Sequence, residues 1–182
     1  MTVTRIYAGL WRVDLERAAG PRLVTGAALA RLAGAALGAG GAPSPASIGL
    51  ILADDARLAE LNREHMGVAG PTDVMSFPLL PPEAYPPHPG RGLVGGDAPA
   101  RRPFVLPPGR RPHLGDIVVS VERAITQAES GRGGQTGDVR WSAADELRLL
   151  VVHGVLHVCG WDHADPAEEA AMRELERRLL AQ

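Results

Sequence analysis

The sequence predicts one globular domain, residues 1–182, that mixes β-strands with α-helices. The chain has 182 residues, 45% of them hydrophobic, which suits a single domain with a buried core. Short runs of β-branched residues occur between Ala- and Leu-rich segments with helical periodicity. Gly and Pro stand between most of these segments, as expected for turns.

Four segments have the pattern of strands. Residues 2–13 are rich in β-branched and aromatic side chains, with Gly9 as the candidate break. Residues 47–52 are continuously apolar, which is typical of a buried strand. Residues 72–78 and 114–120 predict two further strands. If these last two pair antiparallel, the segment between them is a hairpin connection.

Five segments predict helices. Their ranges are 26–37, 54–65 with Asp54 as N-cap, 121–129, 143–159, and a last helix that opens at Asp165-Pro166. Ser142 and Asp145 have the spacing of a capping box at the start of the fourth helix.

Residues 81–112 differ in composition from the rest of the chain. Pro, Gly, Ala and Arg dominate them, and such a stretch buries too little apolar surface to offset its ordering entropy. We expect a long flexible loop inserted between two strands, and a shorter flexible link at residues 131–137. The insertion has five arginines and two acids, so it is either a solvated loop without function or a basic arm that contacts phosphate.

Charge and cysteine content narrow the class of protein. The formal net charge is −2, whereas a domain that binds nucleic acid is usually basic overall. All 19 basic residues are Arg, which indicates a biased genome composition. A single cysteine excludes an internal disulfide framework. With no signal-like apolar segment near the start and no apolar run of about 18 residues, we expect a cytoplasmic protein without a membrane span.

The stretch from residue 151 to residue 163 carries the candidate metal site. It contains three of the six histidines: His153, His157 and His163. His153 and His157 are four residues apart, so they share one face of a helix. Gly160 is suited to end that helix and reverse the chain, which brings His163 back toward the same point. Three imidazoles around one point predict a zinc site at the end of the helix.

Lone histidines in an apolar helix are more often core residues than ligands, and the third histidine is what favours metal binding. Cys159 is a rival ligand, but its position two residues after His157 turns it off the histidine face, so we interpret it as a small buried hydrophobe. Three protein ligands leave one position open to water, which is typical of a catalytic zinc site. Hydrolysis is therefore the expected reaction class.

The same histidine spacing occurs in metzincin proteases. In metzincins a Glu follows the first histidine and serves as general base, whereas Gly154 occupies that position here. Glycine moves no proton, so a metzincin-like protease is the less favoured enzyme class.

The residues 153–163, His-Gly-Val-Leu-His-Val-Cys-Gly-Trp-Asp-His, resemble the signature of the YbeY family of bacterial rRNA-maturation endoribonucleases. The segments Leu61-Asn62, Pro71–Pro78 and Leu114–Ile117 resemble further family segments, in the same order. The resemblance spans about residues 45–182 without the insertion. It implies an α+β fold: a small mixed β-sheet flanked by helices, with the metal at one end of a cleft.

The resemblance also implies a function. The chain would be a single-strand-specific, metal-dependent endoribonuclease with one Zn²⁺ per subunit, held by His153, His157 and His163. It would act in 16S rRNA 3′-end maturation and ribosome quality control, with single-stranded rRNA and the small ribosomal subunit or its assembly factors as partners.

The basic residue of the family is missing from this chain, and the general base is unassigned. Many relatives carry a basic residue in the loop before Thr72, where this chain has none after Arg63. Arg63, Arg123 and the insertion are the remaining candidates for RNA contact.

The general base is unassigned; Asp116 and Asp162 are candidates, although a structural hydrogen bond is the favoured interpretation of both. Trp161 is interpreted as a packing residue rather than one that stacks on a base.

A second class of function remains. The chain could be a non-catalytic ribosome-assembly factor whose metal stabilises the fold. The acidic net charge and the missing general base favour that hypothesis, whereas the open three-histidine site favours the nuclease.

Overall fold

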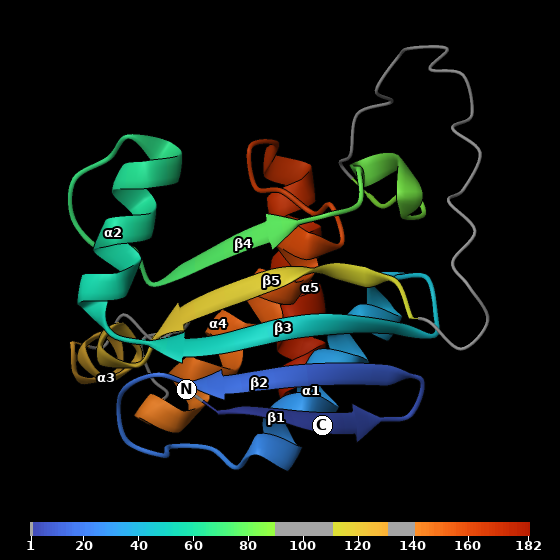
Figure 1. The fold of residues 1–182 in the computed structure, drawn as a ribbon. Coiled ribbons are helices and arrows are strands. Elements are labelled where there is room, and N and C mark those ends of the chain that lie inside the picture. Colours follow the sequence, from blue (N-terminus) through green and yellow to red (C-terminus); the bar gives the residue numbers. More distant parts are fainter. Residues whose placement is uncertain (1, 90–110, 131–140) are drawn as a thin grey trace.

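The computed structural model describes residues 2–89, 111–130 and 141–182 (Figure 1). This part of the chain contains a β-sheet and helices. The strands are β1 (Val3–Ala8), β2 (Trp11–Arg17), β3 (Ala46–Ala53), β4 (Val74–Pro78) and β5 (His113–Ser120). The α-helices are α1 (Gly26–Ala39), α2 (Asp55–Met66), α3 (Val121–Glu129), α4 (Ala143–Val158) and α5 (Pro166–Leu180).

The strands form one mixed sheet in the order β1-β2-β3-β5-β4. The central strand β3 is parallel to β2 and to β5, whereas the outer pairs β1–β2 and β4–β5 are antiparallel. The pair β4–β5 places Ser76 opposite Ile117, as expected for the predicted hairpin. The predicted α+β class, a small mixed sheet flanked by helices, is therefore confirmed.

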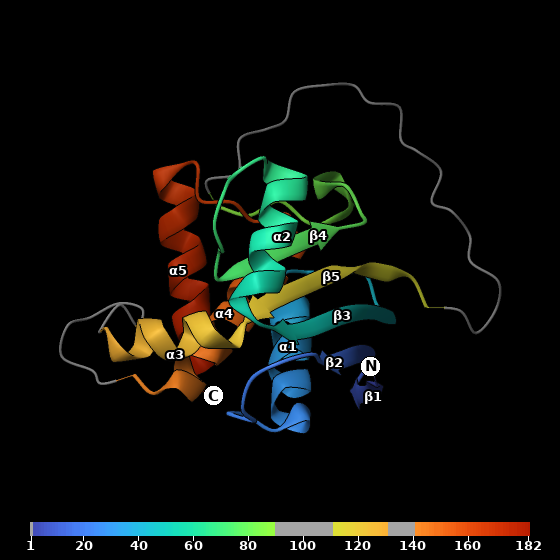
Figure 2. The ribbon, with the colours of Figure 1, turned by 60° about the vertical axis from the view of Figure 1, so that its left-hand side comes forward.

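The helices cover the two faces of the sheet unequally. Figure 1 shows α1, α4 and α5 behind the sheet, and the large core lies between them and the strands, with Ile48, Leu50 and Ile117 fully buried. Figure 2 shows α2 on the opposite side, beside β4 and β5. There it covers a small second cluster that includes Leu58 and Met75.

The first predicted strand is two strands. We expected one strand from residue 2 to residue 13, but the chain reverses after Ala8, and Gly9 has a φ of 61°. Such a left-handed conformation suits glycine in a tight hairpin turn. The alternation then continues to Arg17, with Val13 and Leu15 buried on the core face. The candidate break was thus a turn, and β2 extends beyond the prediction.

Helix α4, which carries the metal motif, begins with the predicted capping box. Ser142 Oγ accepts the N–H of Asp145, and the Asp145 carboxylate accepts the N–H of Ser142. Reciprocal caps of this kind satisfy two N–H groups that have no partner within the helix. The helix runs through the core to Val158, with Leu147, Val151 and Val155 fully buried.

Part of the expected insertion packs on the core. Residues Pro82–Ala84 form a short 3₁₀ helix, Tyr85 is buried, and His88 stacks on Trp161 with ring centroids 4.0 Å apart. The first residues of the expected insertion thus contact the core through their Tyr and His side chains. Residues 90–110, and the link predicted at residues 131–137, lie outside the described part of the chain.

Among the described residues, no helix combines the length and the apolar character needed to cross a membrane.

Candidate metal centre and cleft

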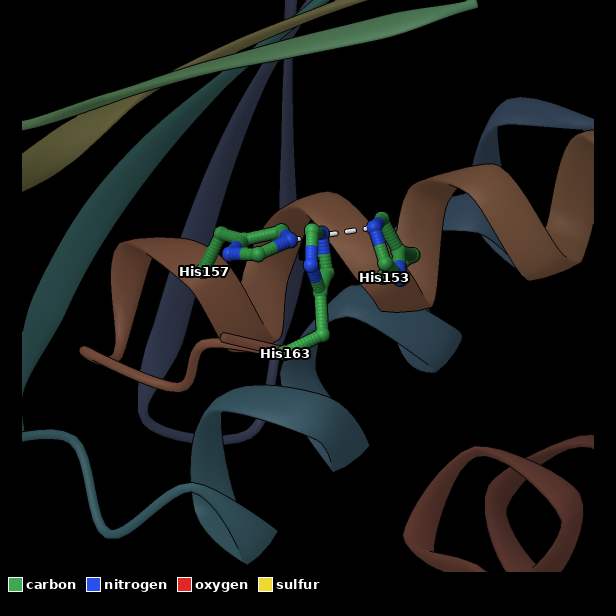
Figure 3. A group of neighbouring side chains, drawn as sticks. All are labelled: His153, His157 and His163. Atoms are coloured by element: carbon green, nitrogen blue, oxygen red, sulfur yellow. Dashed lines mark hydrogen bonds between the residues drawn. The ribbon is translucent and has the colours of Figure 1, made fainter. Parts of the chain in front are cut away.

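The three histidines of the motif meet at one point (Figure 3). His153 and His157 project from the same face of α4, and His163 reaches them from the loop that follows the helix. Gly160 in that loop has a φ of 83°, a backbone conformation that residues other than glycine rarely adopt. One ring nitrogen of each histidine lies within 4.8 Å of the other two. The geometry predicted from the spacing is therefore present.

Two of the imidazoles are oriented by hydrogen bonds at Nδ1. His153 Nδ1 lies 2.8 Å from Oε1 of Glu176, whose side chain is buried, and His157 Nδ1 lies 2.8 Å from the carbonyl oxygen of Trp161. An acceptor at Nδ1 keeps the proton there and leaves the Nε2 lone pair for a metal. The two Nε2 atoms are 3.0 Å apart, so both lone pairs point into the same space.

The environment keeps His157 neutral. Burial, followed by the neighbouring His153 and His163, lowers the pKa of His157 to about 4. An unprotonated imidazole is the form that binds metals. Three imidazoles that meet beside an open cleft are a donor set that suits Zn²⁺ and leaves a further position for water. The residues present thus fit the predicted ion.

Gly154 allows α4 to pack directly against the sheet. A Cβ atom on this residue would lie 2.6 Å from Cγ2 of Ile117 and 3.0 Å from Cγ2 of Val74. Ser76 Oγ donates to the Gly154 carbonyl oxygen at 3.0 Å and joins the helix to β4. No glutamate fits at this position without moving the helix. The structure thus gives a packing reason for the glycine that separates this site from the metzincin motif.

A cleft of about 600 Å³ opens over the histidines. It is lined by Asn62 and Met66 of α2, Ser76 of β4, Pro82 of the 3₁₀ helix and Trp161 of the loop after α4, among other residues. Trp161 is buried and stacks on His88, so it packs as expected.

The family comparison agrees with this geometry. The sequence pattern of the family "Endoribonuclease YbeY" matches residues 27–182. The chain belongs to this family.

Relatives that carry the same name cover most of the chain. An endoribonuclease YbeY of Salinispora tropica is 39% identical over 170 residues, which are 93% of this chain and 94% of the relative. The protein of that name from Symbiobacterium thermophilum is 39% identical over 150 residues, 82% of this chain and 76% of the relative. The solution structure of TM1509 from Thermotoga maritima has the same fold, with a TM-score of 0.53, 21% identity, and coverage of 93% of this chain and 86% of that chain.

The two candidate bases lie in different places. Asp116 is hydrogen-bonded to His113, with its Oδ1 3.0 Å from His113 Nε2, and alternates along β5 with Ile117, which faces α4. It therefore lies on the opposite face of the sheet from the histidines. Asp162 lines the cleft, and its Oδ1 accepts the N–H of His163 at 2.8 Å, so it shapes the loop that carries this ligand.

Neither candidate arginine lines the cleft. Arg63 is exposed on α2. Arg123 Nε donates to Asp55 Oδ2 at 3.1 Å and so pairs α3 with the start of α2. In the described part of the chain, the residues that line the cleft include no arginine.

Sequence reasoning missed Glu176. It lies 23 residues beyond His153, on the face of α5 that also carries the buried Met172, Leu175 and Leu179. An acid among apolar residues at helical spacing is a signal that could have been noticed, because a buried carboxylate needs a partner.

Proposed function

We propose that the protein is a zinc-dependent endoribonuclease that cleaves single-stranded RNA in 16S rRNA 3′-end maturation and ribosome quality control. The observation that carries the proposal is the meeting of His153, His157 and His163 beside a cleft, in a chain of the endoribonuclease YbeY family. We also propose that the chain acts as one domain in the cytoplasm, on the small ribosomal subunit or its assembly intermediates.

The roles of the residues follow from their contacts. His153, His157 and His163 would hold one Zn²⁺, while Glu176 and the Trp161 carbonyl fix the first two rings. When bound, the zinc ion supplies Lewis acidity that polarises a phosphoryl oxygen and acidifies water. The cleft is lined by residues of β4 and by the three histidines, which would place an RNA strand bound in it beside the zinc ion.

A non-catalytic assembly factor with a structural metal is the second candidate. One specific observation favours it: the carboxylates nearest the histidines are engaged, Asp162 with the His163 N–H and Glu176 with His153. A structural metal would explain why both of these carboxylates support the histidines. This candidate predicts loss of stability, and no loss of cleavage, when a ligand is removed.

The test is cleavage of a single-stranded RNA that carries a 16S 3′-end sequence, with a duplex of the same sequence beside it. Wild type, His157→Ala and the control His113→Ala are compared, each with its zinc content and its melting temperature determined. We expect zinc-dependent cleavage of the single strand, reduced more than about 100-fold in His157→Ala, since loss of a mere supporting partner already costs about 10–100-fold. Equal cleavage by wild type and a folded, zinc-free His157→Ala would reject the nuclease in favour of the assembly factor.

A further inference from the structure

A second polar cluster lies beside the histidines. Glu146 on α4, Asp73 before β4 and Gln127 on α3 line a pocket of about 420 Å³ that His153 and His163 also border. The pocket is next to the cleft, since Asp73, His153 and His163 line both.

Glu146 carries a buried oxygen without a partner. The residue is 3% exposed, and its Oε2 makes no hydrogen bond in the described structure. A buried carboxylate without a donor is costly and needs an explanation. Burial, and then the negative charge of Asp73, raises the pKa of Glu146.

Gln127 adds a second oxygen of the same kind. Its Nε2 donates to Asp73 Oδ2 at 2.9 Å, which fixes the orientation of the amide. The Oε1 atom is then turned away from Asp73, and it is buried without a hydrogen-bond partner. Among the described residues, the one arginine on the pocket wall, Arg173, is paired with Glu169. Both Asp73 oxygens accept hydrogen bonds, Oδ1 from the Val74 N–H and Oδ2 from Gln127. The buried Glu146 Oε2 and Gln127 Oε1 are thus the pocket's oxygen atoms without a donor among the described residues.

We propose that Glu146, Asp73 and Gln127 form a binding site for a hard divalent cation, Mg²⁺ or Mn²⁺, beside the three histidines. Two carboxylates and an amide oxygen are the ligands that these ions prefer, and Mg²⁺ commonly binds through one or two carboxylates and several waters. Histidine nitrogens select Zn²⁺, so the two neighbouring sites would bind different ions. A cation here would also offset the acidic wall of the pocket, which otherwise repels an anionic ligand in the adjacent cleft.

The first test locates Mn²⁺ in the wild-type protein. The full chain is loaded with one Zn²⁺ and labelled with ¹³C at the methionine methyls, of which there are four. Met172 lines the proposed site, whereas Met66 and Met75 both line the neighbouring cleft. We expect Mn²⁺ to broaden the Met172 signal at lower concentrations than the Met66 signal. Uniform broadening, or broadening of Met66 first, would overturn the proposal.

The second test measures affinity by electron paramagnetic resonance of free Mn²⁺. Glu146→Gln keeps the size of the side chain and removes its charge, while Glu129→Gln is the same substitution at an exposed position on α3. We expect Mn²⁺ affinity to fall at least about tenfold in Glu146→Gln and to be unchanged in Glu129→Gln, with one Zn²⁺ retained by both. Equal Mn²⁺ affinity in wild type and Glu146→Gln would contradict the proposal.

A further variant separates the site from folding. If Glu146→Gln does not fold, Gln127→Leu removes the Oε1 ligand and leaves both acids in place. It should weaken Mn²⁺ binding, and unchanged affinity would count against the site. These measurements use no RNA, so the site stands or falls independently of the proposed nuclease.

Discussion

The face of the sheet that packs on α4 carries the three-histidine cluster, and the opposite face, on which α2 lies, carries His113 with Ser47 and Asp116. The two sites differ in the contacts of their ring nitrogens. On the α4 face, the Nδ1 atoms of His153 and His157 have acceptors, and their Nε2 atoms are 3.0 Å apart. On the α2 face, His113 has Ser47 Oγ 3.1 Å from Nδ1 and Asp116 Oδ1 3.0 Å from Nε2. Both ring nitrogens of His113 therefore have Ser or Asp partners, whereas the Nε2 atoms of His153 and His157 face each other.

The comparison shows which arrangement of histidines is suited to hold a metal ion. A histidine beside an acid is present on both faces, so that pair alone does not distinguish them. The α4 face adds two imidazoles four residues apart on one helix and a third brought back by a glycine turn. Convergent free nitrogens, rather than the presence of a histidine–acid pair, are the feature that fits a cation.

The largest expected effect is on the packing beneath the α4 cluster. Gly154→Ala places a methyl group 2.6 Å from the buried Ile117 and should lower the free energy of unfolding by about 1–3 kcal/mol. At Gly38 on α1, where a Cβ meets no atom within 4 Å, the same change should raise it by about 0.5–1 kcal/mol. Chemical denaturation of both variants measures the pair. Equal changes in the free energy of unfolding in the two variants would show that close packing of α4 on the sheet does not contribute to stability.

A second prediction concerns the acceptor that orients His153. Glu176→Ala removes the buried carboxylate and should weaken zinc binding by about 10–100-fold, because the ring loses the partner that fixes its proton and its orientation. Glu176→Gln retains an acceptor and should lose less. Competition with a zinc chelator gives both affinities, and an unchanged affinity in Glu176→Ala would assign the carboxylate to folding alone.

The features that the sequence predicted correctly are those formed by residues close together in the chain. The His153–His157 spacing, the turn at Gly160 and the Ser142–Asp145 capping box are local patterns, and all appear in the structure. Contacts between segments distant in the sequence could not be predicted from local patterns. Glu176 reaches His153 from another helix, and Tyr85 and His88 join the core from a Pro-rich segment whose composition predicted a loop. Likewise, the pleat of β5 turns Asp116 away from the histidines, which only the register reveals.

A smaller effect is expected at the start of α4. The hydrogen bond from Ser142, together with its N–H and Arg148, lowers the pKa of Asp145 against the opposing effect of burial. A lowered folded-state pKa stabilises the protein above the ordinary Asp pKa, and this stability is lost as the pH falls through the folded pKa. Ser142→Ala should cost about 1 kcal/mol at neutral pH. The loss of stability in Ser142→Ala, relative to wild type, should be smaller in acid. Chemical denaturation of both proteins at pH 7 and at pH 3 measures this difference. A deficit independent of pH would contradict the reciprocal cap.

The smallest effect is expected on the α2 face. His113→Ala removes a ring whose two nitrogens bind Ser47 and Asp116, and its zinc affinity should equal that of wild type. Chelator competition measures this, beside the Glu176 variants. Reduced zinc affinity would mean that the two faces are coupled.

The most direct measurement is the zinc content of wild type, His157→Ala and His113→Ala after dialysis against a weak chelator. If His153, His157 and His163 together hold the ion, wild type and His113→Ala should each contain one zinc ion per chain, and His157→Ala none. Zinc retained by His157→Ala, or lost from His113→Ala, would contradict the claim that the three convergent imidazoles form the metal centre.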